Sequence, residues 1–270
     1  MTELQKVEFD ILKEFVRICD ELDLTYFLVC GSALGAVKYQ GFIPWDDDVD
    51  VALPREDYKL FCQKAQEMLP KHIFLQNHVT DCRYPMIFSK LRNSNTTYIE
   101  KSLSKLPINH GVYIDVFPLD GYPLSTEERQ ELGRKKLRFQ KKMSCVYYLP
   151  DLKLKARIGY RLRRILGYHR NTNKKIREYE QLISSYPIHN STFICNHGNW
   201  QGDLEYAVSE QYGNGTWADF EGLRVRIPEK YDAYLTQKYG NWRGELPLEE
   251  QKGHHYYTTL DLKKSYKEYI

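Results

Sequence analysis

The sequence predicts an α+β fold, in which a small mixed β-sheet is flanked by helices and carries a basic helical insertion. Apolar residues spaced three and four apart near the start of the chain predict an amphipathic helix. Short runs rich in β-branched and aromatic residues fill much of the first half and predict strands. Beyond Pro123 the pattern becomes helical and strongly basic.

The first half of the chain alternates between predicted helices and strands. Helical periodicity extends from Leu4 to Leu22 and again from Arg55 to Leu69. Ser32 stands where an N-cap residue would precede a short helix. Buried strands are expected at Tyr26–Cys30, Val49–Leu53, Met86–Arg92, Thr96–Ile99 and Val112–Phe117.

The second half is predicted to be mainly helical and to end in an irregular tail. A turn at Glu221 and Gly222 predicts a β-hairpin from Trp217 to Pro228. Helices are expected at about 125–144, 152–168, 172–185 and 229–239. We divide the chain into a catalytic core (1–124), a basic helical region (125–200) and a C-terminal part that completes the active site (201–270).

Composition narrows the class of protein. The 270 residues are 42% hydrophobic and 28% charged, as in an ordinary soluble protein. No stretch approaches the roughly 18 apolar residues of a membrane span, and the charged first residues do not resemble a signal peptide. The six cysteines form no C-x-x-C pair, so we expect reduced thiols and no structural zinc site. These features predict a cytoplasmic protein.

An unusual acidic run stands beside a tryptophan. Asp46, Asp47, Asp48 and Asp50 occupy four of five consecutive positions after Trp45. Carboxylates this close repel one another, which gives a fold no advantage. The run is therefore either a solvated loop or the binding site of a strongly positive group, with Asp46 and Asp47 orienting a ligand water in the second case.

Three of the aspartates favour the second interpretation. Alternation along the predicted strand places Asp48 and Asp50 on one face, and Asp115 is isolated in the apolar strand "VYIDVF". Hard oxygen ligands without a Cys/His set favour Mg²⁺ or Mn²⁺. Gly31 and Ser32, at a strand-to-helix turn, offer backbone N–H groups to a phosphate beside the metal.

The stretch "GSALGAVKYQGFIPWDDDVDVALPREDY" resembles the signature of the LicD family, which belongs to the nucleotidyltransferase-fold superfamily and is related to the fukutin proteins. The similarity continues through "SKLRNSNTTYIE" and "HGVYIDVFPLDGYP", and extends to "YGNWRGELPLEEQKGHH". One departure is the longer spacing between Gly-Ser and Asp-x-Asp than in many nucleotidyltransferases. The inserted "GFIPWD" is itself LicD-like and weighs against simple nucleotide transfer.

The resemblance implies a nucleotidyltransferase-like core and a metal-dependent reaction. Phosphocholine, or glycerol or ribitol phosphate, would pass from CDP-choline or another CDP-alcohol to a sugar hydroxyl, and CMP would be released. The acceptor would be a lipid-linked precursor of a cell-surface glycan such as teichoic acid or lipopolysaccharide. Asp48, Asp50 and Asp115 would fill the three carboxylate positions, with Gly31 and Ser32 in the phosphate-binding turn.

Further residues are candidates for donor binding. Lys90 and Arg92 alternate on a predicted strand and could reach the diphosphate, although ordinary surface charge explains them equally well. Trp45 could stack on cytosine or face a trimethylammonium group, against the alternative of simple packing.

The C-terminal part of the similarity supplies three more candidates. His254 and His255 could return to the site as phosphate contacts or acid/base groups, although paired tail histidines often have no such role. Arg243 has a similar but weaker claim.

The basic segment is the chain's most polarised region. From Arg129 to Arg177 there are 17 Lys or Arg and two acidic residues, against a net charge of +3 for the whole chain. Within 152–170, Leu154, Ile158, Leu162 and Ile165 form an apolar stripe beside a basic stripe of Lys153, Arg157, Arg161 and Arg164. This pattern predicts either a helix on an anionic membrane surface, hence at the inner face of the plasma membrane, or a docked helix with a solvated basic face. RNA binding has no supporting motif, and no nucleic acid is expected.

Two rival functions remain. A nucleotidyltransferase acting on a small alcohol or drug would release pyrophosphate instead of CMP. A non-catalytic membrane- or RNA-binding module would have no reason to keep three adjacent carboxylates.

Overall fold

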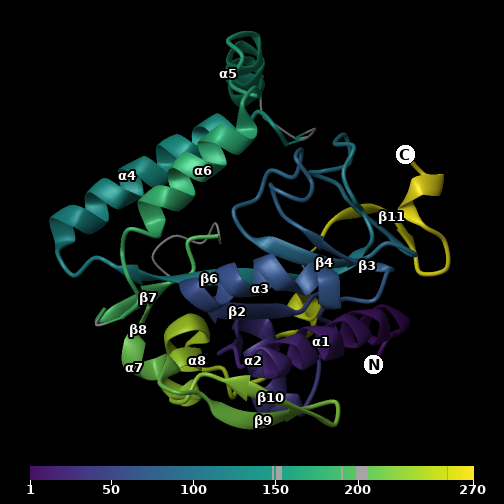
Figure 1. Ribbon diagram of the computed structural model, residues 1–270, viewed down its shortest axis with the longest axis vertical. Coiled ribbons are helices and arrows are strands. Elements are labelled where there is room, and N and C mark those ends of the chain that lie inside the picture. Colours follow the sequence, from purple (N-terminus) through teal and green to yellow (C-terminus); the bar gives the residue numbers. More distant parts are fainter. Residues whose placement is uncertain (148, 150–153, 190, 199–205, 254) are drawn as a thin grey trace.

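A computed structural model describes residues 1–147, 149, 154–189, 191–198, 206–253 and 255–270. Its centre is a seven-stranded mixed sheet (Figure 1). Five strands follow the order β1–β2–β6–β4–β3, and β7 and β8 extend the sheet from the far end of β6. The bounds are β1 Phe27–Leu28, β2 Asp50–Pro54, β3 Ile73–Gln76, β4 Ser89–Asn93, β6 Val112–Tyr122, β7 Phe193–Cys195 and β8 Tyr206–Val208.

Strand β6 organises this sheet. Its 11 residues run parallel to β2, antiparallel to β4, and at their end antiparallel to β7. Ten of them are buried, which explains the nearly continuous apolar run "VYIDVFPL". Asp50 lies opposite Asp115 in the β2–β6 register, so the shared strand pair brings these two aspartates side by side.

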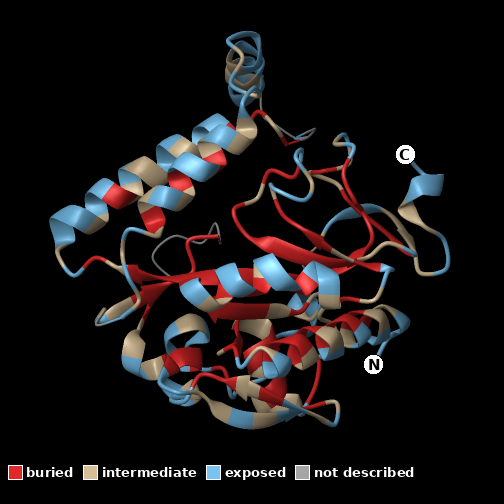
Figure 2. Ribbon diagram, viewed as in Figure 1, coloured by how far each residue is buried: buried red, intermediate tan, exposed pale blue. Residues whose placement is uncertain are grey.

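Helices flank the sheet, in agreement with the predicted α+β class. Helix α1 (Glu3–Glu21) begins with a capping box between Thr2 and Gln5, and its apolar face packs on the sheet together with that of α3 (Arg55–Met68). Figure 2 shows the resulting buried layer. The remaining helices are α2 Cys30–Tyr39, α4 Thr126–Met143, α5 Leu154–Ile165, α6 Thr172–Ile183, α7 Ser209–Tyr212 and α8 Tyr231–Tyr239, with the 3₁₀ turns η2 Leu248–Glu250 and η3 Tyr266–Glu268.

The predicted basic helices are present and form an arm. Helices α4 and α6 lie side by side, and Phe139 of α4 stacks on Tyr179 of α6 with ring centroids 4.3 Å apart. Helix α5 stands beyond the ends of these two helices (Figure 1). The sheet takes strands from residues 27–122 and from 193–208, and the division of the chain into three domains stays a prediction.

The predicted hairpin is confirmed. Strands β9 (Thr216–Phe220) and β10 (Leu223–Ile227) pair antiparallel around Glu221 and Gly222, which have φ values of 55° and 81°. Two consecutive residues with positive φ define the turn whose twist matches that of a two-stranded ribbon.

Three local predictions were wrong. Helix α2 begins at Cys30, not after Ser32, so Ser32 lies inside the first turn and is not the N-cap. Strand β2 begins at Asp50, which leaves Asp48 in the preceding loop. The tail is not irregular throughout, because β11 (Tyr257–Asp261) pairs with β5 (Thr97–Glu100), more than 150 residues away.

Candidate active site

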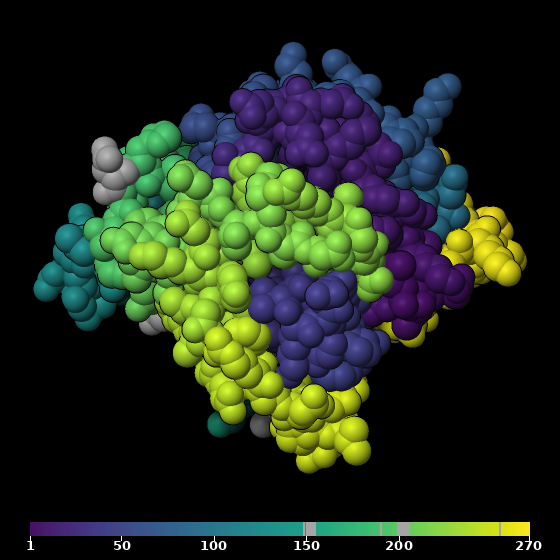
Figure 3. Space-filling view, turned by 90° about the horizontal axis from the view of Figure 1, so that it is seen from below, coloured from purple at the N-terminus to yellow at the C-terminus, as the bar shows by residue number. Residues whose placement is uncertain are grey.

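A cavity of ≈ 590 Å³ lies where α2, the acidic loop and the sheet meet the C-terminal part of the chain. Figure 3 shows the segment around residues 30–50 at the surface, with residues of the C-terminal third above, to the left of and below it. Two contacts join the two parts: Lys38 Nζ donates to the Gly244 carbonyl at 2.6 Å, and His255 contacts Asp47. The lining comes mainly from three separate parts of the chain, around 30–50, 86–117 and 238–255, and includes Gly31, Trp45, Asp48, Asp50, Asp115 and His255.

All three aspartates of the predicted metal site open into this cavity. Burial raises the pKa of Asp50 above the ordinary carboxyl value, and the charges of Asp48 and Asp115 raise it further. Burial also raises the pKa of Asp115, although the charge of Lys90 opposes this shift. The cavity therefore concentrates carboxylates in an environment that penalises their charge.

Helix α1 and a glycine hold the acidic loop in place. Buried Gln5 donates through Nε2 to the carbonyls of Ile43 and Asp46, at 3.2 and 3.0 Å. A Cβ atom on Gly31 would lie 2.8 Å from Asp46 Oδ2, so the Asp46 carboxylate packs directly against the glycine in the first turn of α2. Burial, followed by the neighbouring charge of Asp48, raises the pKa of Asp46 to about 8.

His255 brings a positive charge to this loop from the C-terminal segment. Its Nδ1 lies 3.1 Å from Asp47 Oδ1, and its Nε2 lies 3.8 Å from Asp48 Oδ2. Burial opposes the imidazolium, but the hydrogen bond with Asp47 and the charge of Asp48 outweigh it and raise the pKa of His255 to about 10. Asp47, Asp48 and His255 offer ligand atoms within 4.8 Å of one another, a grouping that the sequence did not predict.

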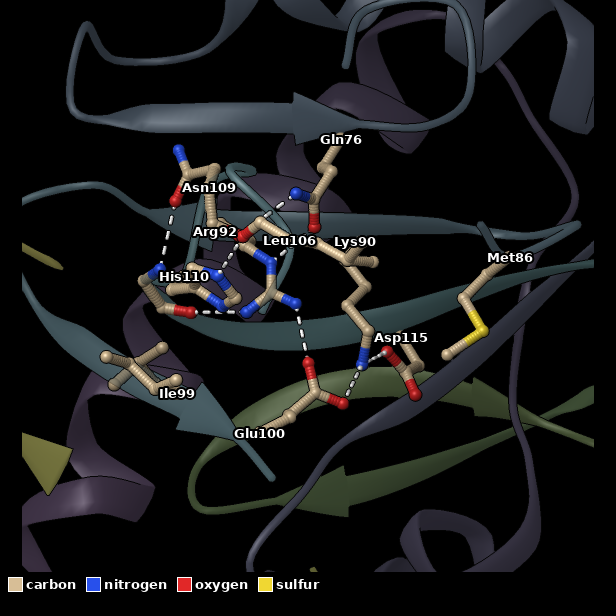
Figure 4. A network of polar contacts seen from close by, with 12 residues as sticks. Gln76, Met86, Lys90, Arg92, Ile99, Glu100, Leu106, Asn109, His110 and Asp115 are labelled. Carbon is tan, nitrogen blue, oxygen red and sulfur yellow. Dashed lines mark hydrogen bonds and ion pairs between the residues drawn. The ribbon is translucent and has the colours of Figure 1, made fainter. Parts of the chain in front are cut away.

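Lys90 and Arg92 belong to a buried polar network (Figure 4). Lys90 Nζ lies 2.8 Å from Asp115 Oδ1 and 3.5 Å from Glu100 Oε1. Arg92 is fully buried and donates to Gln76 (2.5 Å), the Gly111 carbonyl (2.7 Å) and Glu100 (2.7 Å). Burial opposes ionisation of Glu100, yet Lys90 and Arg92 lower its pKa to about 2.

This network separates the two basic side chains that the sequence grouped together. Lys90 lines the cavity, where its ammonium stands beside Asp115. Arg92 lies behind Glu100 and outside the cavity lining, with its donors committed to the protein. The structure therefore does not bring the Arg92 guanidinium to a ligand in the cavity.

Of the other predicted site residues, some lie at the cavity and others lie away from it. Ser32 is buried, and its Oγ accepts a hydrogen bond from the Asp50 N–H at 2.8 Å, so it positions a candidate ligand. Trp45 lines the cavity beside Tyr39, with ring centroids 6.3 Å apart. Arg243 lies outside the lining, paired with Asp232 at 2.5 Å and stacked on Trp242. His254 lies outside the described residues.

Several lining residues were missed by the sequence analysis. Tyr39 and Lys38 end helix α2, and Lys238, Tyr239 and Trp242 follow from α8. The signal for the last group was available, because it lies in or beside the family-like stretch "YGNWRGELP". Glu100 also lies within a family-like stretch, but its ion pairs with Lys90 and Arg92 join β5 to β4 and depend on tertiary packing.

The donor set fits a hard divalent cation. Asp48 and Asp50 line the cavity, and burial, followed by the charges of Asp48 and Asp115, raises the pKa of Asp50, so a cation beside these carboxylates would relieve an unfavourable charge. Asp115 already has the ammonium of Lys90 as a counter-ion. Asp48 and Asp50 are therefore the candidate ligands for such an ion.

A mixed sheet that directs clustered carboxylates into a cavity is an arrangement typical of enzymes that transfer phosphorus-containing groups. The sequence of residues 23–148 matches the family model described as LicD/FKTN/FKRP, nucleotidyltransferase domain. Residues 23–148, which include Asp48, Asp50 and Asp115, are therefore a domain of the LicD family, and the predicted resemblance is confirmed.

Curated relatives extend this match. The chain is 28% identical over 282 aligned positions to the lipopolysaccharide cholinephosphotransferase LicD of Haemophilus influenzae, covering 94% of this chain and 96% of the relative. A shorter similarity, 33% over 63 residues, links it to the uncharacterized protein RT0683 of Rickettsia typhi, covering 23% of this chain and 19% of that protein.

Proposed function

We propose that this protein transfers phosphocholine, or a related phospho-alcohol, from a CDP-linked donor to a sugar hydroxyl of a cell-surface glycan. The favoured acceptor is lipopolysaccharide, because the Haemophilus relative is named for that substrate and aligns over nearly the whole chain. Teichoic acid is a second glycan with suitable hydroxyl groups. The reaction releases CMP.

The observation that carries this proposal is the shared opening of Asp48, Asp50 and Asp115 into one cavity that also has aromatic walls. A quaternary ammonium group is attracted to aromatic faces, and a phosphate next to it requires positive charge. Trp45 supplies an aromatic face, and Lys38 and Lys238 supply positive charge along the same lining. This combination suits a zwitterionic phosphocholine group better than a neutral sugar alone.

Mg²⁺ or Mn²⁺ would be held by Asp48 and Asp50. When bound, the ion would supply Lewis-acid polarisation of phosphate oxygens and neutralise charge on the donor. Asp115 would accept or route the proton of the attacking sugar hydroxyl, with Lys90 holding its carboxylate in position.

His255 has a separate task in this scheme. In the metal-free protein a pKa of about 10 keeps its imidazolium protonated at neutral pH, which places a positive charge beside Asp47 and Asp48. This charge offsets repulsion within the acidic loop and offers a donor to a phosphate oxygen. On the strength of its contacts with Asp47 and Asp48, we assign His255 charge compensation.

Nucleotidyl transfer is the rival that a specific observation favours, because the matching family model is described as a nucleotidyltransferase domain. The two reactions differ in which phosphorus atom is attacked. Transfer of the phospho-alcohol releases CMP, whereas transfer of a nucleotide to an alcohol releases pyrophosphate. The products therefore discriminate between these functions without any structural assumption.

The test is mass spectrometry of products from CDP-choline, CDP-glycerol and CDP-ribitol with lipopolysaccharide or teichoic acid as acceptor. We expect CMP and an acceptor heavier by one phospho-alcohol, with loss of both products in Asp50→Asn. Asp10→Asn, on the exposed face of α1, is the matched control and should retain wild-type activity. Pyrophosphate release from a nucleoside triphosphate, with no transfer from any CDP-alcohol, would overturn the proposal.

A further inference from the structure

The apolar stripe of helix α5 lies on the surface of the arm. Ile158 is 52% exposed, Leu162 55% and Ile165 81%, and Leu166, just beyond the helix, is 70% exposed. Single exposed apolar residues are ordinary, but three on one helix with a fourth directly after it form a patch that usually has a partner. The side chain of Leu154, also part of the predicted stripe, lies outside what the structure describes.

The rest of the described protein does not cover this stripe. Tyr160 and Arg164 attach α5 to the body, since Tyr160 Oη donates to the Tyr147 carbonyl at 3.1 Å and Arg164 to the Cys145 carbonyl at 3.4 Å. Ile158 and Leu162 are each two positions from Tyr160, which places them about 160° around the helix. The interpretation of α5 as a helix docked through its apolar face is therefore wrong.

Basic side chains border the stripe on both sides. Lys155 and Arg161 are each three positions from Ile158, and so lie about 60° to either side of it. Both are exposed, as is Arg157, and α5 contains no acidic residue. An apolar strip between rows of cations complements a surface with phosphates at its face and hydrocarbon beneath.

We propose that α5 is a membrane-docking helix that lies in the plane of an anionic bilayer. Ile158, Leu162 and Ile165 enter the headgroup–acyl boundary, and Lys155, Arg157 and Arg161 contact lipid phosphates. No helix among the described residues is long and apolar enough to cross a bilayer. Docking at the interface is the mode that the length and charge of α5 allow, and it goes beyond the transferase activity proposed above.

Two other partners fit the surface less well. A nucleic acid would pair with the cations but would leave the apolar stripe uncovered. A second copy that covered the stripe symmetrically, with α5 against α5, would bring two acid-free, basic helix faces together, and like charges at that distance repel. An anionic lipid surface pairs with the basic side chains through its phosphates and covers the apolar stripe with hydrocarbon.

The first test measures cosedimentation of the full chain with vesicles of phosphatidylcholine alone or mixed with phosphatidylglycerol. We expect binding only to the anionic vesicles, and weaker binding at high salt. In Lys155→Gln/Arg157→Gln/Arg161→Gln, the partition coefficient should fall roughly 100-fold, because each basic side chain near such a surface contributes about 1 kcal/mol. The control Lys71→Gln/Lys263→Gln/Lys267→Gln removes three exposed cations elsewhere and should bind like wild type.

The second test changes only the stripe. Ile158→Ser/Leu162→Ser should lose at least about tenfold in partition, because less apolar surface is buried on docking. The control Val79→Ser/Leu248→Ser removes exposed apolar side chains elsewhere and should have no effect. Wild-type protein that ignores anionic vesicles at low salt would overturn the proposal, as would a stripe variant that binds vesicles normally but loses self-association or RNA binding. No donor or acceptor is present, so the result is independent of the proposed activity.

Discussion

The cavity and the helical arm use the same charged residue types in opposite ways. Lys90 is only 2% exposed and stands between Asp115 and Glu100, so its charge is fixed by the fold. Arg157 and Arg161 on α5 are exposed. A buried charge must be paired, whereas an exposed one is available to a partner. The comparison supports the two proposals, which assign the chemistry to the cavity and the association with a partner to the arm.

The largest expected effect is on catalysis. Asp50→Asn should lower kcat at least about 10³-fold, because a candidate cation ligand in the cavity is lost. The metal-free melting temperature should stay the same or rise, since burial and two neighbouring carboxylates disfavour the Asp50 charge. Steady-state CMP release and thermal melting measure the two effects. Near-wild-type turnover would remove the cavity from the mechanism.

The next effect is on stability. Glu100→Gln should lower the free energy of unfolding by about 3 kcal/mol at pH 7, because it removes the carboxylate that pairs with buried Arg92 and leaves Lys90 with Asp115 alone. The folded pKa of Glu100, about 2, lies below its ordinary value of 4.5, so its stabilisation is present above pH 4.5 and disappears as the pH falls towards 2.

Urea denaturation measures this loss, and an exposed pair is the control. Glu131 lies 2.8 Å from Lys135 on the surface of α4, so Glu131→Gln should leave the denaturation midpoint unchanged. Equal effects of the two substitutions would contradict the distinction between buried and exposed charge.

A smaller effect concerns donor affinity. Trp45→Ala should raise the KM for CDP-choline by about tenfold with a smaller change in kcat, because the lost aromatic face contributes to binding the ammonium group. Trp217, on the exposed hairpin and stacked with Arg224, is the matched control. A kcat loss without a KM change would instead place Trp45 near the reacting groups.

A further prediction compares the melting temperatures of wild type and Glu180→Gln at two pH values. Burial raises the pKa of Glu180 on α6 from 4.5 to about 7, so its favourable contribution to folding is complete below pH 4.5 and is lost as the pH rises to 7. Glu180→Gln should therefore gain melting temperature relative to wild type at pH 8, and less at pH 5. Nearby His78 has a lowered pKa but is present in both proteins, so it largely cancels. A constant difference between pH 5 and 8 would contradict the raised pKa.

The smallest expected effect is on the free energy of unfolding, for a substitution in the helical arm. Leu162→Ser should change the free energy of unfolding by no more than about 0.5 kcal/mol, because the side chain is 55% exposed. Leu91→Ser, fully buried in the sheet, should cost several kcal/mol. Comparable losses in urea denaturation would mean that the stripe is part of the core.

The sequence correctly predicted the helices and the hairpin that depend on residues close together in the chain. The spacing in α1 and α3 fixed both helices to within a residue or two, and the Glu221–Gly222 turn specified the hairpin. The start of α2 was missed because Cys30 enters the helix at a φ of 51°, a conformation that no residue pattern announces. Strand β11 was missed because β5, the strand it pairs with, is more than 150 residues away.

In the candidate site, too, the sequence did not reveal contacts between segments that are far apart in the chain. Strand alternation correctly placed Asp50 and Asp115 among the lining residues. It could not separate Lys90 from Arg92, because Glu100 on β5 and the Gly111 carbonyl, which bury Arg92, come from other segments. The contact of His255 with Asp47 spans 208 positions and depends on how the C-terminal segment returns to the loop.

The most direct test of the cavity's role is a calorimetric titration of Mn²⁺ into metal-free protein, without donor or acceptor. We predict saturable binding to wild type and to the surface control Asp10→Asn, with a higher melting temperature in both. Binding to Asp50→Asn should weaken at least about tenfold, with no thermal stabilisation at the same Mn²⁺ concentration. Identical binding by wild type and Asp50→Asn would contradict the assignment of the cavity as the cation site.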